Sequence, residues 1–165
     1  MRPLLSALAA AALLASTALA LAESCARPPE KAAFDVAGLK SELMVVAIAC
    51  QQQDRYNQFV TRFRSDLQGD ERSLNGYFAR TGARAQQRHD DYITNLANTQ
   101  SEDGIKQGTL FCDQHKSMFD EVLALKDGHD LPGYATAKGL VQPVEIIECP
   151  APAALRKKLR TASEK

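Results

Sequence analysis

The first 22 residues decide in which compartment this chain folds, and so which folds and bonds are open to it. They read MRPLLSALAAAALLASTALALA, with one basic residue, Arg2, before an uncharged run of Leu and Ala that ends in small residues. This pattern is typical of a secretory signal peptide, and Ala20-Leu21-Ala22 fits the small-x-small cleavage rule. We therefore predict that residues 1–22 are removed and that the mature chain is periplasmic or secreted. A cut after Ala20 and an uncleaved membrane anchor are the alternatives.

The expected location indicates how the four cysteines are used. An even number of cysteines in an exported chain predicts two disulfides, for which three pairings exist. Cys25 and Cys149 lie near the two ends of the expected domain, each close to proline. Cys50 and Cys112 lie within helical patterns. We therefore favour the pairing Cys50–Cys112 and Cys25–Cys149.

Apolar residues recur at spacings of three and four along most of the chain, which is the period of an amphipathic helix. The stretch LMVVAIAC, at 43–50, is apolar nearly all round, so we expect its helix at the centre of the core. The expected helices run from a cap at Asp35 to Cys50, from Asp54 to Gly69, from Asp70 to Gly82, from about Ala85 past Leu96, and from a cap at Ser101 to about Lys126. About five helices with short connections predict a single all-α bundle.

The C-terminal part is predicted to be irregular. Residues 140–147, LVQPVEII, alternate weakly, but Pro143 restricts them to an edge strand or an extended segment. Residues 150–165 form a basic tail, which we expect to be flexible. The predicted organisation is therefore a signal peptide (1–22), a helical domain (23–149) stapled by two disulfides, and the tail.

Charge is balanced overall but unevenly placed. The 20 basic and 20 acidic residues give no strong field toward nucleic acid, and no later apolar run is long enough to span a bilayer. Residues 54–88 hold seven arginines against four acids, whereas residues 89–130 hold nine acids and three lysines. This polarity predicts a binding surface on the arginine-rich helices, at Arg55, Arg62, Arg72, Arg80, Arg84 and Arg88. The alternative is that these charges are solvated helix faces that neutralise one another.

The stretch TLFCDQHKSMF, at 109–119, places Cys112 three residues before His115, on one helix face. A nucleophilic cysteine needs a free thiolate, which an exported chain with a partner cysteine lacks. We therefore predict no catalytic residue, and His115 and His89 are the candidates if one exists. His115 falls within the apolar arc of its helix, so we expect it to be packed in the core or to line a pocket.

Neither a metal nor a cofactor is expected. His89, His115 and His129 are scattered, and the chain has no HExxH and no His-x3–5-His pair. It also lacks the C-x-x-C-H haem motif, a phosphate loop and a G-x-G-x-x-G turn.

The segments CQQQDRYNQFVTRF, YITNLANTQS and GTLFCDQHKSMFD resemble those of a family of small exported, mainly helical, disulfide-bonded proteins of unknown function. The resemblance covers about residues 39–120. It implies an exported helical protein and brings no catalytic residue with it.

These observations favour a non-enzymatic binding or interaction module, with another envelope protein or a small ligand as its partner. The aromatic stripe of Tyr56, Phe59 and Phe63 is expected to pack in the core, with a ligand cavity between helices as the alternative. One alternative function is a hydrolase that uses His115 or His89 with a nearby carboxylate. Another is an envelope stress chaperone that loosens at low pH, or an immunity-type inhibitor. A pocket containing His115 and a carboxylate would favour the enzyme.

Overall fold

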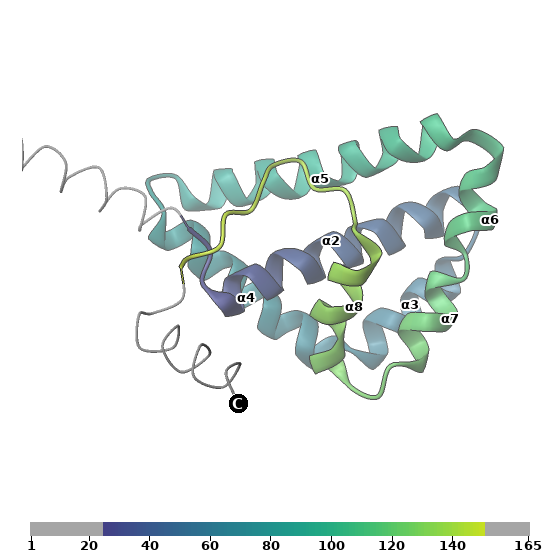
Figure 1. Cartoon of the computed structure of the whole chain (residues 1–165), viewed down its shortest axis with the longest axis horizontal. Helices are drawn as coiled ribbons and strands as arrows, with labels where there is room; N and C mark the ends of the chain where they lie inside the picture. Colours follow the sequence, from purple (N-terminus) through teal and green to yellow (C-terminus); the bar gives the residue numbers. More distant parts are fainter. Residues whose placement is uncertain (1–24, 151–165) are drawn as a thin grey trace, which may run out of the picture.

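The computed structural model describes residues 25–150, so the expected signal peptide and nearly all of the basic tail lie outside the described residues. Within this range the chain is all-α, as predicted, and has two disulfides. Ala26 and Glu148 form an isolated parallel bridge. The elements, labelled in Figure 1, are α2 (Pro28–Ala49), α3 (Gln53–Arg62), α4 (Arg64–Arg80), α5 (Ala85–Gln107), η1 (Gly108–Leu110), α6 (Phe111–His115), α7 (Met118–Ala124), η2 (Gly128–Asp130) and α8 (Leu131–Lys138).

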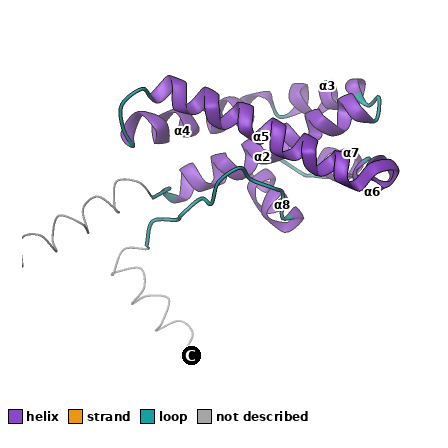
Figure 2. Ribbon diagram, turned by 90° about the horizontal axis from the view of Figure 1, so that it is seen from above, coloured by secondary structure: helices purple, strands orange, loops and turns teal. Residues whose placement is uncertain are grey.

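Helix α2 runs through the middle of the molecule and packs against α3, α4, α5 and α8 (Figure 1). Its side chains Phe34, Leu39, Leu43 and Val46 are at most 1 % exposed, which confirms the prediction of a central helix. Figure 2 shows α8 on the side of α2 away from α4. None of the helices among residues 25–150 is long and apolar enough to cross a bilayer.

Two groups of buried side chains form the core. Around the N-terminal half of α2, the ring of Phe34 makes edge contacts with Tyr77, Phe78 and Tyr92, with centroids 4.9 to 6.0 Å apart. This geometry is the one that aromatic pairs prefer. Around its C-terminal half, Leu43 packs with Phe59, Phe63 and Phe119. The aromatic stripe therefore packs in the core, although Tyr56 at its end is only half-buried.

Several helix boundaries differ from the prediction. Helix α2 begins at Pro28, not after Asp35, because proline is tolerated in a first turn, where its missing N–H has no intrahelical partner. Asp35 instead accepts a hydrogen bond from Lys31, one turn back. The predicted breaks at Gly69 and Ser101 are also wrong. Both residues lie inside helices, and α5 continues to Gly108, whose positive φ of 60° ends it.

The disulfides join the residues that the sequence favoured, and they lie at the two ends of α2. Cys25–Cys149 closes a separation of 124 residues just before α2. Cys50–Cys112 closes one of 62 residues just after it and ties α2 to α6. The central helix is therefore fixed covalently at both ends to distant parts of the chain.

Helix α8, which the sequence analysis did not predict, turns the chain back toward the N-terminal end of α2. The extended segment 139–149 follows it and runs along α5 and α2 to Cys149 (Figure 1). Backbone hydrogen bonds of 2.8 Å join its end to Ala26. Gln142 bridges the segment to the helices, since it accepts from the Tyr92 hydroxyl and donates to the Phe34 carbonyl. Residues 140–147 are therefore extended but form no strand.

Candidate ligand-binding site

Cys112 and His115 lie one helical turn apart but do not form a reactive thiol–imidazole pair. Cys112 is bonded to Cys50, and the described chain has no free cysteine. The His115 side chain is 22 % exposed and its Nε2 lies 3.8 Å from Glu42 Oε1 on α2. Its Nδ1 lies 3.0 Å from the carbonyl oxygen of Phe111, and the two rings are in contact. His115 is thus neither sealed in the core nor part of the cavity described below.

Glu42, which contacts His115, is unusual because its carboxyl group is buried on the central helix. It is 6 % exposed, and its only charged contact within residues 25–150 is the long one to His115. Burial raises the pKa of Glu42 to about 7, and the negative charge of Asp103 acts in the same direction. The carboxyl therefore holds a proton over part of the neutral pH range.

His89 lies between two carboxylates. Its ring is buried against Phe78, with Nε2 2.9 Å from Glu71 Oε1 and Nδ1 3.3 Å from Asp90 Oδ1. The contact with Glu71 has the distance of an ion pair, although its angles are not those of a hydrogen bond. Both nitrogens thus face acids, which suits a positioned imidazole as well as a packed one.

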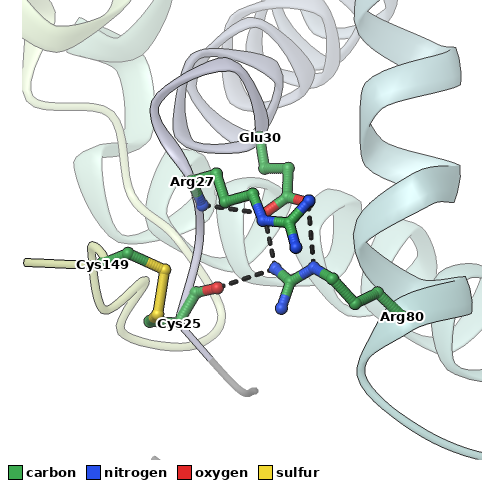
Figure 3. The surroundings of a disulfide bond; sticks show 5 residues. All are labelled: Cys25, Arg27, Glu30, Arg80 and Cys149. Carbon is green, nitrogen blue, oxygen red and sulfur yellow. Dashed lines mark hydrogen bonds and ion pairs between the residues drawn. A yellow bond between two sulfur atoms is a disulfide. The ribbon is translucent and has the colours of Figure 1, made fainter. Parts of the chain in front are cut away.

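The six arginines of the predicted binding surface have different surroundings. Arg80 contacts Glu30 at 2.6 Å and the Cys25 carbonyl at 2.8 Å, beside the Cys25–Cys149 disulfide (Figure 3). Arg88 donates to the Phe78 and Thr81 carbonyls at the end of α4, where unpaired carbonyls need donors. Both side chains therefore support the fold and are only partly accessible.

The other four arginines are more accessible. Arg55 pairs with Asp120, and Arg62 donates to the Leu125 carbonyl at 2.6 Å. Arg72 and Arg84 are exposed and make no ion pair with a described residue. A binding surface on the arginine-rich helices stays a prediction. Of the six arginines, Arg72 and Arg84 are the ones whose charge is not engaged by a described acidic residue or carbonyl.

A cavity of about 260 Å³ lies between α2, α3, α4 and α5. Most of its wall is apolar. The open volume arises where the helices carry small side chains, namely Ala33 and Ala37 on α2 and Ala97 on α5. Its other lining residues are Val36, Lys40, Ser41, Met44, Tyr56, Leu67, Asp70, Glu71, Leu74 and Ile93. Concave, mostly apolar sites with few polar groups are typical of small-molecule pockets.

Two polar groups on this wall have no partner in the protein. The Ser41 hydroxyl on α2 is buried and makes no hydrogen bond within the described chain. The Asp70 carboxyl on α4 makes neither a hydrogen bond nor an ion pair with any of residues 25–150. Burial raises the pKa of Asp70 to about 6, and nearby Asp66 adds to this, while His129 acts in the opposite direction. Buried polar groups normally have partners, so the Ser41 hydroxyl points to a missing ligand or solvent, and the half-buried Asp70 carboxyl offers a charge on the same wall.

An outer depression of about 530 Å³ adjoins the cavity. Lys40, Leu67, Glu71 and Ile93 line both spaces, so they form the boundary between them. The depression adds His89 from α5, together with Val60, Arg64 and Gln68 from α3 and α4. Of the two candidate histidines, His89 is therefore the one beside the cavity.

Sequence reasoning missed Ser41 and Asp70. Asp70 was interpreted as the start of a helix, because it follows Gly69. The signal for Ser41 was present, since the polar residues Lys40, Ser41 and Glu42 directly precede the apolar run at 43–50 of the same helix. No group of three or more His, Cys, Asp or Glu side chains in the part of the chain that the structure describes is arranged to hold a metal ion.

No protein-family model, curated protein or solved structure was found to match this chain. The resemblance over residues 39–120 therefore stays a prediction, and function has to be argued from the site itself.

Proposed function

We propose that this protein is an exported, non-enzymatic binding protein that takes a small molecule into the cavity between α2, α3, α4 and α5. The observation that carries this proposal is the pair of unpartnered groups, Ser41 Oγ and the Asp70 carboxyl, on an otherwise apolar wall. Leaving the buried Ser41 hydroxyl unpaired costs about 1–3 kcal/mol, which a ligand with a matching polar atom would recover, and the half-buried Asp70 carboxyl adds a charge beside it.

Export is supported by the pattern of the first 22 residues and by the two disulfides, which are typical of chains that fold in an oxidising compartment. The chain recovered from the envelope fraction should begin at Glu23 when its N-terminus is sequenced. A chain that retains residues 1–22 would contradict this part of the proposal.

A binding role is favoured over hydrolysis by the contacts of the two histidines. Within residues 25–150, the polar contacts of His89 and His115 are to carboxylates and a backbone carbonyl, and the cysteines are in disulfides. A nucleophile–base pair would need a hydroxyl or thiol within hydrogen-bond reach of an imidazole. The hydrolase alternative would have to use His89, because His89 lies beside the cavity and His115 does not.

The test is a thermal-shift screen of the purified chain against a library of small molecules. Ala97→Leu adds a larger side chain to the cavity wall, and Ala79→Leu makes the same change on the exposed face of α4. Ligands that stabilise the native chain and Ala79→Leu, but not Ala97→Leu, would support the proposal. Ligands that stabilise all three chains equally, or none at all, would contradict it.

A further inference from the structure

We propose that the ligand of this cavity is a small organic ammonium ion, bound by the Asp70 carboxylate and the Ser41 hydroxyl, with its apolar part among the alanine and leucine side chains. This inference rests on the proposed function and names the chemical class of the ligand. It predicts that the sign of the ligand's charge decides binding.

The charges around the cavity favour a cation. Asp70 makes no ion pair with a described residue, and the influence of His129 on its pKa is smaller than those of burial and of the second negative charge at Asp66, one turn before it on α4. Glu71 on the same helix also lines the cavity. An ammonium ion would compensate for the desolvation of Asp70, whereas a carboxylate would add to the repulsion.

The other charged or titratable residues near the cavity do not reverse its preference for a cationic ligand. Lys40, from α2, is the one cation among the cavity's lining residues, and it is exposed, so its ammonium group can stay in water. The α5 residues of the wall, Ile93 and Ala97, carry no charge. His89 lies at 2.9 Å from Glu71 in the outer depression, and His129 on η2 is exposed.

The remaining lining groups suit the other parts of an amine. The Ser41 hydroxyl can accept a hydrogen bond from an ammonium N–H, and the half-buried Tyr56 adds an aromatic ring, a group that attracts cations, to the lining. The volume of about 260 Å³ exceeds the roughly 150 Å³ of an apolar cavity that binds benzene. A single ring or a short alkyl chain with one ammonium group therefore fits.

The charge preference can be measured by isothermal titration calorimetry at pH 7.5 with benzylamine, benzyl alcohol and benzoate, which share one ring. We expect benzylamine to bind at least tenfold more tightly than benzyl alcohol, and benzoate to bind most weakly. Equal or tighter binding of the alcohol or of benzoate, or no binding of benzylamine, would overturn the inference. If all three bind equally but none binds Ala97→Leu, the cavity is a ligand site and only the ligand class is wrong.

Variants assign the preference to particular side chains. Asp70→Asn should weaken benzylamine binding about tenfold and leave benzyl alcohol unchanged, and Ser41→Ala should weaken benzylamine by a smaller factor. Lys40→Met should strengthen benzylamine binding, because it removes a competing cation at the exposed edge. Asp91→Asn makes the same substitution as Asp70→Asn at an exposed position of α5 and should change nothing. Equal loss in Asp91→Asn and Asp70→Asn would overturn the assignment.

The pH dependence gives a readout that loss of folding would not mimic. An ammonium ligand binds the ionised form of Asp70, so benzylamine affinity should fall as pH is lowered through about 6. The groups that act on this carboxyl are Asp66 and His129, and Lys40 and Glu71 line the same cavity. In Asp70→Asn the fall should be absent, and a fall that persists there would overturn the role of Asp70.

Discussion

Arg80 Nη2, at the end of α4, lies 2.6 Å from Glu30 Oε2 in the first turn of α2 (Figure 3). The same guanidinium donates to the Cys25 carbonyl, and the backbone N–H of Arg27 donates to Glu30. Burial raises the pKa of Glu30, but the hydrogen bonds from Arg80 and Arg27 outweigh burial and hold it below its ordinary value. One arginine therefore connects α4, α2 and the residue that carries the first disulfide.

Arg80→Met should destabilise the chain by about 3 kcal/mol, because it leaves the largely buried Glu30 carboxylate without its cation. The measurement is urea unfolding at pH 7. Since the pKa of Glu30 is lowered in the folded chain, the stabilisation by this pair is lost as pH falls below 4.5. The difference between native chain and variant should therefore shrink at low pH. Arg72→Met, an exposed position on the same helix, should change stability little, and an equal loss there would contradict the assignment.

The two disulfides should have separable effects. By loop entropy, Cys50–Cys112 contributes about 4 kcal/mol and Cys25–Cys149 about 5 kcal/mol. Replacing Cys25 and Cys149 by alanine should also release the extended segment 139–149, which ends at Cys149. We expect hydrogen exchange of this segment to rise in the Cys25→Ala/Cys149→Ala chain and to stay slow in the Cys50→Ala/Cys112→Ala chain. The same exchange pattern in both would show that α8 and Gln142 hold the segment without the disulfide.

The predicted arginine surface can be tested without disturbing the fold. Arg72 and Arg84 are exposed and make no ion pair within residues 25–150, so Arg72→Glu and Arg84→Glu should leave the melting temperature nearly unchanged. If the surface binds an acidic envelope protein, both changes should reduce crosslinking to it in the native envelope. Unchanged crosslinking in the folded double variant would count against the surface. Reversal of Arg80 is not informative, because it would break the pair with Glu30.

Sequence reasoning found the central helix and the cysteine pairing for physical reasons that are local. A run that is apolar nearly all round is mostly buried, although Ile48 near its end is 67 % exposed, and cysteines at the two ends of a domain can meet. The internal boundaries failed because glycine and serine are weak signals in a helix that tertiary packing stabilises. Gly69 lies inside α4, and the break between α3 and α4 falls at Phe63, whose ring is buried in the core.

The candidate site was harder to predict from the sequence than the fold. Ser41, Asp70 and Ala97 lie on three helices, and nothing in their spacing along the chain indicates that they share one cavity. Their significance depends on which polar atoms stay without partners after packing, which is a property of the folded chain. His89 and His115 were the candidates in case a catalytic residue existed, and in the folded chain carboxylates contact both of them.

The buried carboxyl of Glu42 should make the chain more stable in mild acid than in mild base. Its pKa is about 7 when folded and 4.5 in a free chain, so between these values the folded chain holds a proton that the unfolded chain releases. Stability from this group therefore rises as pH falls through 7 and is complete below 4.5. This direction is opposite to the low-pH loosening that the stress-chaperone alternative requires.

Glu42→Gln should remove this pH dependence, because the amide keeps the shape of the protonated side chain. We expect the variant to be more stable than the native chain at pH 8, by on the order of 2 kcal/mol with solvent screening allowed for, and nearly equal to it at pH 5. Glu102→Gln, at an exposed position of α5, is the matched control and should follow the native chain at both values. Urea unfolding at pH 5, 6.5 and 8 measures all three chains. The prediction would be wrong if the native chain became more stable from pH 5 to pH 8 and Glu42→Gln showed the same gain. Glu42 would then not be the group that controls the pH dependence.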